Sequence, residues 1–222
     1  MSARLVEVRH PIADDALATL RDRRTPTDAF ARALDRLARV LAVTALSDLP
    51  AEPDEVETPV ARAAVRRLLP GGVVLVPILR AGLGFVDAFR ALVPQAMVAM
   101  VGVVRDESAR AIPYLERVPA LGAGQRVLVL DPMLATGGSA AVALRCLRDH
   151  GALGEAVTLV VAIAAPAGIA AAGAALPGVR VVAGAVDSGL DEHKYIVPGL
   201  GDAGDRLFGA AAPRPLREEA PR

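Results

Sequence analysis

Cysteine and lysine are almost missing from this sequence of 222 residues, which contains one of each. The single cysteine, Cys146, excludes an internal disulfide and is typical of proteins in a reducing compartment. We expect it to pack within a helix, because leucines stand nearby at 144 and 147. The one lysine is Lys194, in an arginine-rich chain whose bias we attribute to base composition.

Net charge is missing as well, since 25 basic and 25 acidic residues balance. This balance disfavours a general attraction to nucleic acid or to anionic membranes, and we expect neither as a partner. The longest apolar stretch without a breaker, 156–165, fits a buried strand and is too short to cross a bilayer. The first residues do not have the charged region followed by an apolar region that is typical of a secretory signal peptide, so we expect a cytoplasmic protein.

Strands and helices are expected to alternate along most of the chain. Apolar runs typical of buried strands recur at 73–79, 97–103, 127–130, 157–163 and 179–186. Their alternation with helical patterns predicts an α/β fold, with a mostly parallel central sheet and helices on both faces. The length suits one domain, which we place at 1–209, followed by a disordered tail at 210–222.

Four segments carry predictions of their own. An amphipathic helix that packs or dimerises is expected over about 25–47. Residues 50–59 are acidic and broken by prolines, and a short helix is expected after them at 60–69. Residues 104–120 are mostly polar, contain two prolines and lack a helical period, so we expect a mobile flap or a hairpin there.

The most informative segment leads from a buried strand through Asp131 to the start of a helix after Ser139. Thr136, Gly137, Gly138 and Ser139 bring backbone N–H groups and hydroxyls to that helix start, an arrangement that suits a monophosphate. Asp131 instead suits sugar hydroxyls or a hydrated divalent metal. Because no lysine follows the glycine pair and the spacing is not G-x-G-x-x-G, ATP hydrolysis and dinucleotide binding are disfavoured.

Two arginines stand at the ends of other expected strands. Arg80 precedes Gly82 and Gly84 ahead of a helix, so its forked charge and a close backbone approach suit a second anion. Arg105 stands where the strand at 97–103 leaves the sheet. The alternative for each is an arginine that caps a strand end or lies in solvent.

Together these motifs resemble the type I phosphoribosyltransferases, and more closely their uracil branch, whose phosphate loop reads very like residues 131–139. Most type I relatives carry two adjacent acids where this chain has Leu130 and Asp131, and the single acid is the pattern of the uracil branch. The resemblance extends from Val6 to Gly209. It implies a pentosyltransferase that converts uracil and 5-phosphoribosyl 1-diphosphate to UMP and diphosphate, in pyrimidine salvage.

The resemblance also assigns residues to ligands. The phosphoribosyl diphosphate is expected to contact Arg80, Arg105, Asp131, Pro132, Met133, Leu134, Ala135, Thr136, Gly137, Gly138, Ser139 and Asp202. Uracil is expected to contact Ile196, Gly201, Asp202 and Ala203, in a base-binding loop or small hood at about 187–206. Asp131, Arg105 and Asp202 are expected to act in catalysis. Without the resemblance, the glycine-rich segment 195–206 would be an ordinary structural loop.

The cofactor and the assembly likewise follow from the resemblance. Mg²⁺ is expected to bind through oxygens of the donor rather than through direct protein ligands. A homodimer or larger homo-oligomer and a GTP effector are implied by relatives. His193 is expected to be a solvated loop residue, and Lys194 stands where the family usually has glycine. The rival hypotheses are a regulatory nucleotide sensor of the same fold and a phosphoribosyltransferase for another base.

Overall fold

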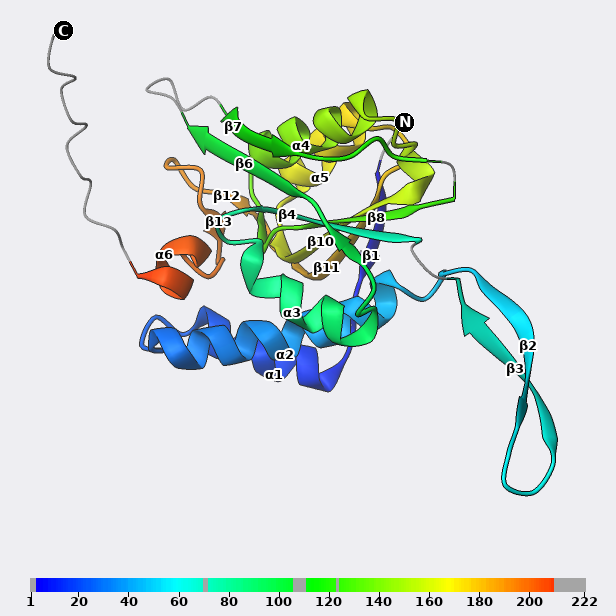
Figure 1. Ribbon diagram of the computed structural model, residues 1–222. Helices are drawn as coiled ribbons and strands as arrows, with labels where there is room; N and C mark the ends of the chain where they lie inside the picture. Colours follow the sequence, from blue (N-terminus) through cyan, green and yellow to red (C-terminus); the bar gives the residue numbers. More distant parts are fainter. Residues whose placement is uncertain (1–2, 70–71, 106–110, 123, 210–222) are drawn as a thin grey trace, which may run out of the picture.

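The computed structural model describes residues 3–69, 72–105, 111–122 and 124–209, and its body is a sheet with helices on both faces (Figure 1). Along the sheet the strand order is β1-β11-β10-β8-β4-β6-β7, parallel up to β6 and antiparallel between β6 and β7. The strands are β1 (Arg4–Glu7), β4 (Val73–Leu79), β6 (Met100–Arg105), β7 (Ala111–Arg117), β8 (Arg126–Leu130), β10 (Val157–Ala164) and β11 (Arg180–Val186), with β5 (Met97–Val98) beside β4 and β9 (Met133–Leu134) beside β10. The predicted α/β fold with a mostly parallel sheet is confirmed.

The helices are divided between the two faces of the sheet (Figure 1). One face carries α1 (Pro11–Arg21), α2 (Thr27–Ala45) and α3 (Leu83–Leu92). The other carries α4 (Gly138–Asp149) and α5 (Pro166–Ala175), with a short 3₁₀ helix, η1 (Gly154–Ala156), ahead of β10. The last described helix, α6 (Ala203–Phe208), packs against α2.

Both faces of the central strands are buried, which explains their continuous apolar runs. Leu75 and Leu128 enter the core under α1, α2 and α3, whereas Val76 and Val129 enter the core under α4 and α5. Burying one such side chain stabilises the fold by about 1.5–3 kcal/mol. The rigid sheet that results holds the ends of its strands in fixed positions.

The helix predicted over about 25–47 is α2, and its apolar stripe is fully buried. Phe30, Leu34, Leu37 and Leu41 repeat at helical spacing and pack against α1, α3 and the sheet. The prediction that this helix packs is therefore confirmed. Its role in dimerisation stays a prediction.

The short helix predicted at 60–69 is wrong. These residues form β3 (Arg62–Leu68), which pairs antiparallel with β2 (Ala51–Glu57) in a hairpin that projects from the body (Figure 1). Acidic side chains of β2 face arginines of β3, as in the Glu55–Arg62 pair at 3.1 Å. Opposite charges on the two strands therefore stabilise their pairing. The periodicity of each segment taken alone could not show this pairing.

Residues 111–117 form β7, antiparallel to β6, so the segment predicted as a flap or hairpin contains a strand pair. Residues 106–110 of this segment and the predicted tail at 210–222 lie outside the described residues. Tyr114 lies over Gly102, where an added Cβ would come within 2.5 Å of its ring. Among the described helices, none combines the length and apolarity needed to cross a membrane.

Candidate active site

The site lies at the switch point of the sheet, where consecutive strands are added on opposite sides of β4. From β4 the chain adds β6 on one side, and it then returns to add β8 on the other side. In parallel sheets, ligands bind in the crevice at the carboxyl ends of strands beside such a switch point. A cleft of about 240 Å³ opens here, lined by Ile78, Leu79, Arg80, Ala81, Asp131, Met133, Leu134, Ala135, Thr136, Gly137, Gly138, Ser139, Ala140, Asp202 and Gly204.

Most residues predicted to bind the phosphoribosyl diphosphate therefore share one cleft. Pro132 is an exception, because it is buried and its carbonyl accepts hydrogen bonds from Ala162 and Ile163 of β10 at 3.0 and 3.1 Å. The backbone of Arg105 ends β6, but its side chain is outside the description.

The loop before α4 has the geometry of an anion site. Gly137 caps the helix with φ of 79°, and the Gly138 N–H donates to the Thr136 hydroxyl at 3.4 Å. The first-turn N–H groups of a helix have no partners within that helix, and its dipole is positive at this end. The loop therefore presents donors and partial positive charge toward the cleft.

We expect Gly137→Ala to destabilise the protein by about 2 kcal/mol, because an L residue is strained at this φ and the added Cβ would lie 2.6 Å from the Ala171 Cβ. Gly138→Ala is the matched control, since its Cβ would make ordinary contacts at 3.6 Å or more. Thermal unfolding of both variants measures the difference. Equal stability of the two would show that the left-handed turn is not required.

Asp131 directly follows β8, and its Oδ1 accepts a hydrogen bond from the Met133 N–H at 3.4 Å. Burial is the largest influence on its pKa, which is raised to about 7; the hydrogen bond from Met133 lowers the pKa in part, and the negative charge of Asp202 adds a smaller increase. Two carboxylates, those of Asp131 and Asp202, therefore share the cleft. A ligand hydroxyl or a bound cation would favour the charged form.

Arg80 reaches the cleft from the end of β4. Its guanidinium lies 3.5 Å from the Asp205 carboxylate, and both side chains are half exposed. Such a long, solvated ion pair contributes little to stability. An arriving anion can therefore replace Asp205 at low cost.

A second cavity of about 280 Å³ adjoins the first, and the two share Met133, Ala135 and Asp202 as a common wall. Its other lining residues are His193, Lys194, Tyr195 and Ile196. Two of the residues predicted to bind uracil, Ile196 and Asp202, thus line this cavity. Ala203 is fully buried in the core and lines neither cavity.

The segment that frames the second cavity is a small hairpin of β12 (Gly189–Leu190) and β13 (Ile196–Val197). His193 lies at its exposed turn, with 73% of the side chain accessible, which confirms that it is a solvated loop residue. Lys194 adopts a left-handed φ of 68°, which explains why glycine also suits this position.

Cys146 lies in α4 and is buried, as predicted. Burial, with nearby acidic groups, raises the pKa of its thiol to about 11, so the group stays protonated at neutral pH. It is therefore a packing residue and has no thiolate character.

Sequence reasoning missed the side chains that hold the second cavity in place. Asp187 directly follows β11 and forms an ion pair with Arg21 of α1, and Arg206 of α6 reaches back to the end of α1. An acidic residue directly after a buried strand was a signal for Asp187. For Arg21 and Arg206, nothing in the neighbouring sequence indicated which residues they would contact.

A mostly parallel sheet with its switch point here, a glycine-rich helix start in the cleft and a second adjoining cavity form the architecture of the type I phosphoribosyltransferases. A family model described as "Uracil phosphoribosyltransferase" matches residues 7–210. This chain belongs to the uracil phosphoribosyltransferase family.

Relatives of known name and structure agree with this membership. The chain is 42% identical over 203 residues to the uracil phosphoribosyltransferase of Lactococcus lactis subsp. cremoris, covering 91% of this chain and 96% of that protein. It is 43% identical, with the same coverage, to that of Streptococcus agalactiae. The solved structure of the AQ2163 protein from Aquifex aeolicus is 38% identical and has a TM-score of 0.86, covering 93% of this chain and 99% of that one.

Proposed function

We propose that this chain transfers the 5-phosphoribosyl group from 5-phospho-α-D-ribose 1-diphosphate to N1 of uracil, which yields UMP and diphosphate. The observation that carries the proposal is the pair of adjoining cavities with a shared wall, because the reaction joins a phosphorylated sugar to a flat base. The names of the relatives support uracil as the base. Salvage of free uracil is the process that this chemistry serves.

Each group of the donor has a counterpart in the first cleft. The 5-phosphate binds at the start of α4, where residues 136–139 supply N–H and hydroxyl donors. Asp131 accepts hydrogen bonds from the ribose hydroxyls. Arg80 neutralises the diphosphate, and Arg105 is assigned to the same group by family resemblance.

Mg²⁺ fits the donor set of this cleft as a cation bound mainly through the substrate. Within the described ranges no cluster of three or more His, Cys, Asp or Glu side chains could hold a metal, but Asp131 and Asp202 both face the cleft. Burial, with a smaller contribution from the charge of Asp202, raises the pKa of Asp131, so a cation nearby would favour the charged form of this carboxylate. When bound, Mg²⁺ supplies positive charge that stabilises the leaving diphosphate.

The side chains then act by position and charge. The bond from C1 to diphosphate breaks ahead of bond formation to N1, so positive charge develops on the ribose; as the new bond forms, N1 loses its proton, which leaves with the diphosphate. Asp131 stabilises that charge through the ribose hydroxyls, and Arg80 stabilises the negative charge on the departing diphosphate. The β6–β7 strand pair, which carries Tyr114, is placed to exclude water that would hydrolyse the donor.

The second cavity binds uracil and recognises its polar edge. Uracil presents an acceptor, a donor and an acceptor along one edge, and backbone groups of the segment 196–203 complement this pattern. Gly201 has a φ of 75°, a left-handed backbone conformation that residues with a side chain disfavour. Asp202 stands between the two cavities, where base and ribose must meet.

We expect Arg80→Ala to weaken pyrophosphate binding by about 10- to 100-fold, because one charge-assisted contact contributes about 1.5–3 kcal/mol. Calorimetric titration with pyrophosphate measures this change. The matched control is Arg36→Ala, which removes an exposed ion pair with Asp15 away from the cleft. Unchanged affinity in Arg80→Ala would return this arginine to a structural role.

Assembly, regulation and location complete the proposal. The β2–β3 hairpin extends from the body and exposes Val60 and Leu68, which supports a homo-oligomer in which another subunit covers them. GTP as an effector is supported by the resemblance alone. A cytoplasmic location is supported by the single cysteine, kept as a thiol.

A further inference from the structure

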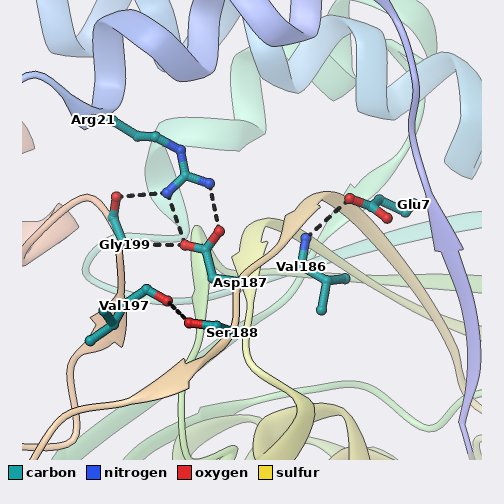
Figure 2. Close-up of polar contacts among 7 residues, drawn as sticks. All are labelled: Glu7, Arg21, Val186, Asp187, Ser188, Val197 and Gly199. Atoms are coloured by element: carbon teal, nitrogen blue, oxygen red, sulfur yellow. Dashed lines mark hydrogen bonds and ion pairs between the residues drawn. The ribbon is translucent and has the colours of Figure 1, made fainter.

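Asp187 is the most deeply buried carboxylate among the described ion pairs, with 5% of its side chain exposed. Its two oxygens accept hydrogen bonds from the two terminal nitrogens of Arg21, at 2.7 and 2.9 Å (Figure 2). Burial alone would raise its pKa, but hydrogen bonds from Arg21 and Gly199 hold the pKa below its usual range. The pair is therefore charged at neutral pH and has the paired fork geometry that fixes orientation as well as distance.

Both members of this pair also hold one residue of the loop after β13. Gly199 donates its N–H to Asp187 at 2.9 Å and accepts a hydrogen bond from Arg21 on its carbonyl, also at 2.9 Å (Figure 2). Gly199 has a φ of 66°, and an added Cβ would lie 2.0 Å from the Ile196 carbonyl oxygen. Its peptide groups are thus oriented by the ion pair in a conformation that other residues cannot adopt.

A second arginine attaches the same loop from its other end. Arg206 donates to the carbonyls of Leu200 at 2.8 Å and Asp22 at 2.7 Å, and also to that of Leu20. Its guanidinium lies 4.3 Å from the centre of the Phe30 ring. Carbonyls at a helix end lack partners within the helix, so they readily accept these hydrogen bonds. The loop 198–202 is therefore tied to the end of α1 on both sides.

We infer that the Arg21–Asp187 pair positions the base-binding loop, so that α1 sets the geometry of base recognition without touching either substrate. The ion pair orients Gly199, which stands between Ile196 on one side and Gly201 and Asp202 on the other. Neither Arg21 nor Asp187 lines the cleft at the start of α4, and of the loop 198–202 only Asp202 does, so we expect the effect on uracil to exceed any effect on the diphosphate of the donor. This inference depends on the proposed role of residues 196–203 in binding uracil.

The test compares three variants of the ion pair and one control variant by steady-state kinetics and pyrophosphate titration. We expect Arg21→Gln and Asp187→Asn to raise KM for uracil by about 10- to 100-fold, as displaced positioning groups do, while pyrophosphate affinity changes by less than about twofold. Arg21→Lys keeps the charge but cannot supply three forked contacts, so we expect a smaller rise in KM for uracil. Arg36→Gln, which breaks the exposed pair with Asp15 between α1 and α2, is the control and should match the wild type.

Two outcomes would overturn the inference. One is an unchanged KM for uracil in a folded Arg21 variant, and the other is an equal loss of uracil and pyrophosphate binding, which would indicate general damage to the fold. If Arg21→Gln does not fold, Arg21→Lys decides between these outcomes. A wild-type protein that forms no nucleotide from uracil would instead contradict the proposed function, so the two failures are distinguishable.

Discussion

Asp131→Asn is expected to keep the fold and to lower kcat/KM by about 10- to 100-fold, because a charge-assisted hydrogen bond contributes about 1.5–3 kcal/mol. Asparagine has the same shape but loses the negative charge that we propose binds the ribose hydroxyls. Steady-state kinetics with uracil and the phosphoribosyl donor measure the loss. Asp149→Asn, an exposed carboxylate of α4, is the control and should behave as the wild type. Near-wild-type kinetics in folded Asp131→Asn would remove Asp131 from the site.

The same residue predicts a pH dependence. The pKa of Asp131 is about 7 in the free protein against an ordinary value of 3.8, so the carboxylate becomes charged only as the pH rises through about 7. Donor affinity should therefore increase with pH below about 7 and level off above it, and this slope should vanish in Asp131→Asn. Because the folded state binds this proton more tightly than the unfolded state, the residue lowers stability as pH rises from about 4 to 7. An unchanged pH slope in Asp131→Asn would assign the titration to another group.

Uracil is expected to be used about 10² to 10⁴ times better than cytosine in kcat/KM, since each unpaired buried polar group costs about 1–3 kcal/mol. Cytosine replaces the O4 acceptor of uracil by an amine donor and the N3–H donor by a lone pair. A loop whose backbone groups are held in place, as Gly199 is, cannot adapt to both changes.

The experiment follows nucleotide formation from uracil, cytosine, hypoxanthine and adenine with the phosphoribosyl donor and Mg²⁺. It also separates the rival hypotheses, because a nucleotide sensor without enzymatic activity would form no product from any base. If a purine is the best acceptor, the assignment of residues 196–203 to uracil is wrong. The assignment of the donor to the cleft at the start of α4 would stand.

Several parts of the molecule were predictable because their patterns are local. A parallel strand covered on both faces needs an unbroken apolar run, so the runs in the sequence were enough to predict β4, β8, β10 and β11. The helix α2 was evident from its apolar stripe. The loop before α4 was evident because a left-handed turn needs glycine and an anion site needs donors at a helix start.

The tertiary structure decided everything that depends on a distant partner. The segment 60–69 is a strand only because the acidic strand β2 pairs with it. Arg21 and Asp187 are separated by 166 positions, and their pairing exists only once α1 lies beside the end of β11. The amino-acid sequence by itself thus determined the strands, the amphipathic helix and the glycine-rich loop before α4, whose physics acts over a few neighbouring residues. The orientation of the loop 198–202 came from hydrogen bonds and ion pairs between elements that only the folded sheet brings together.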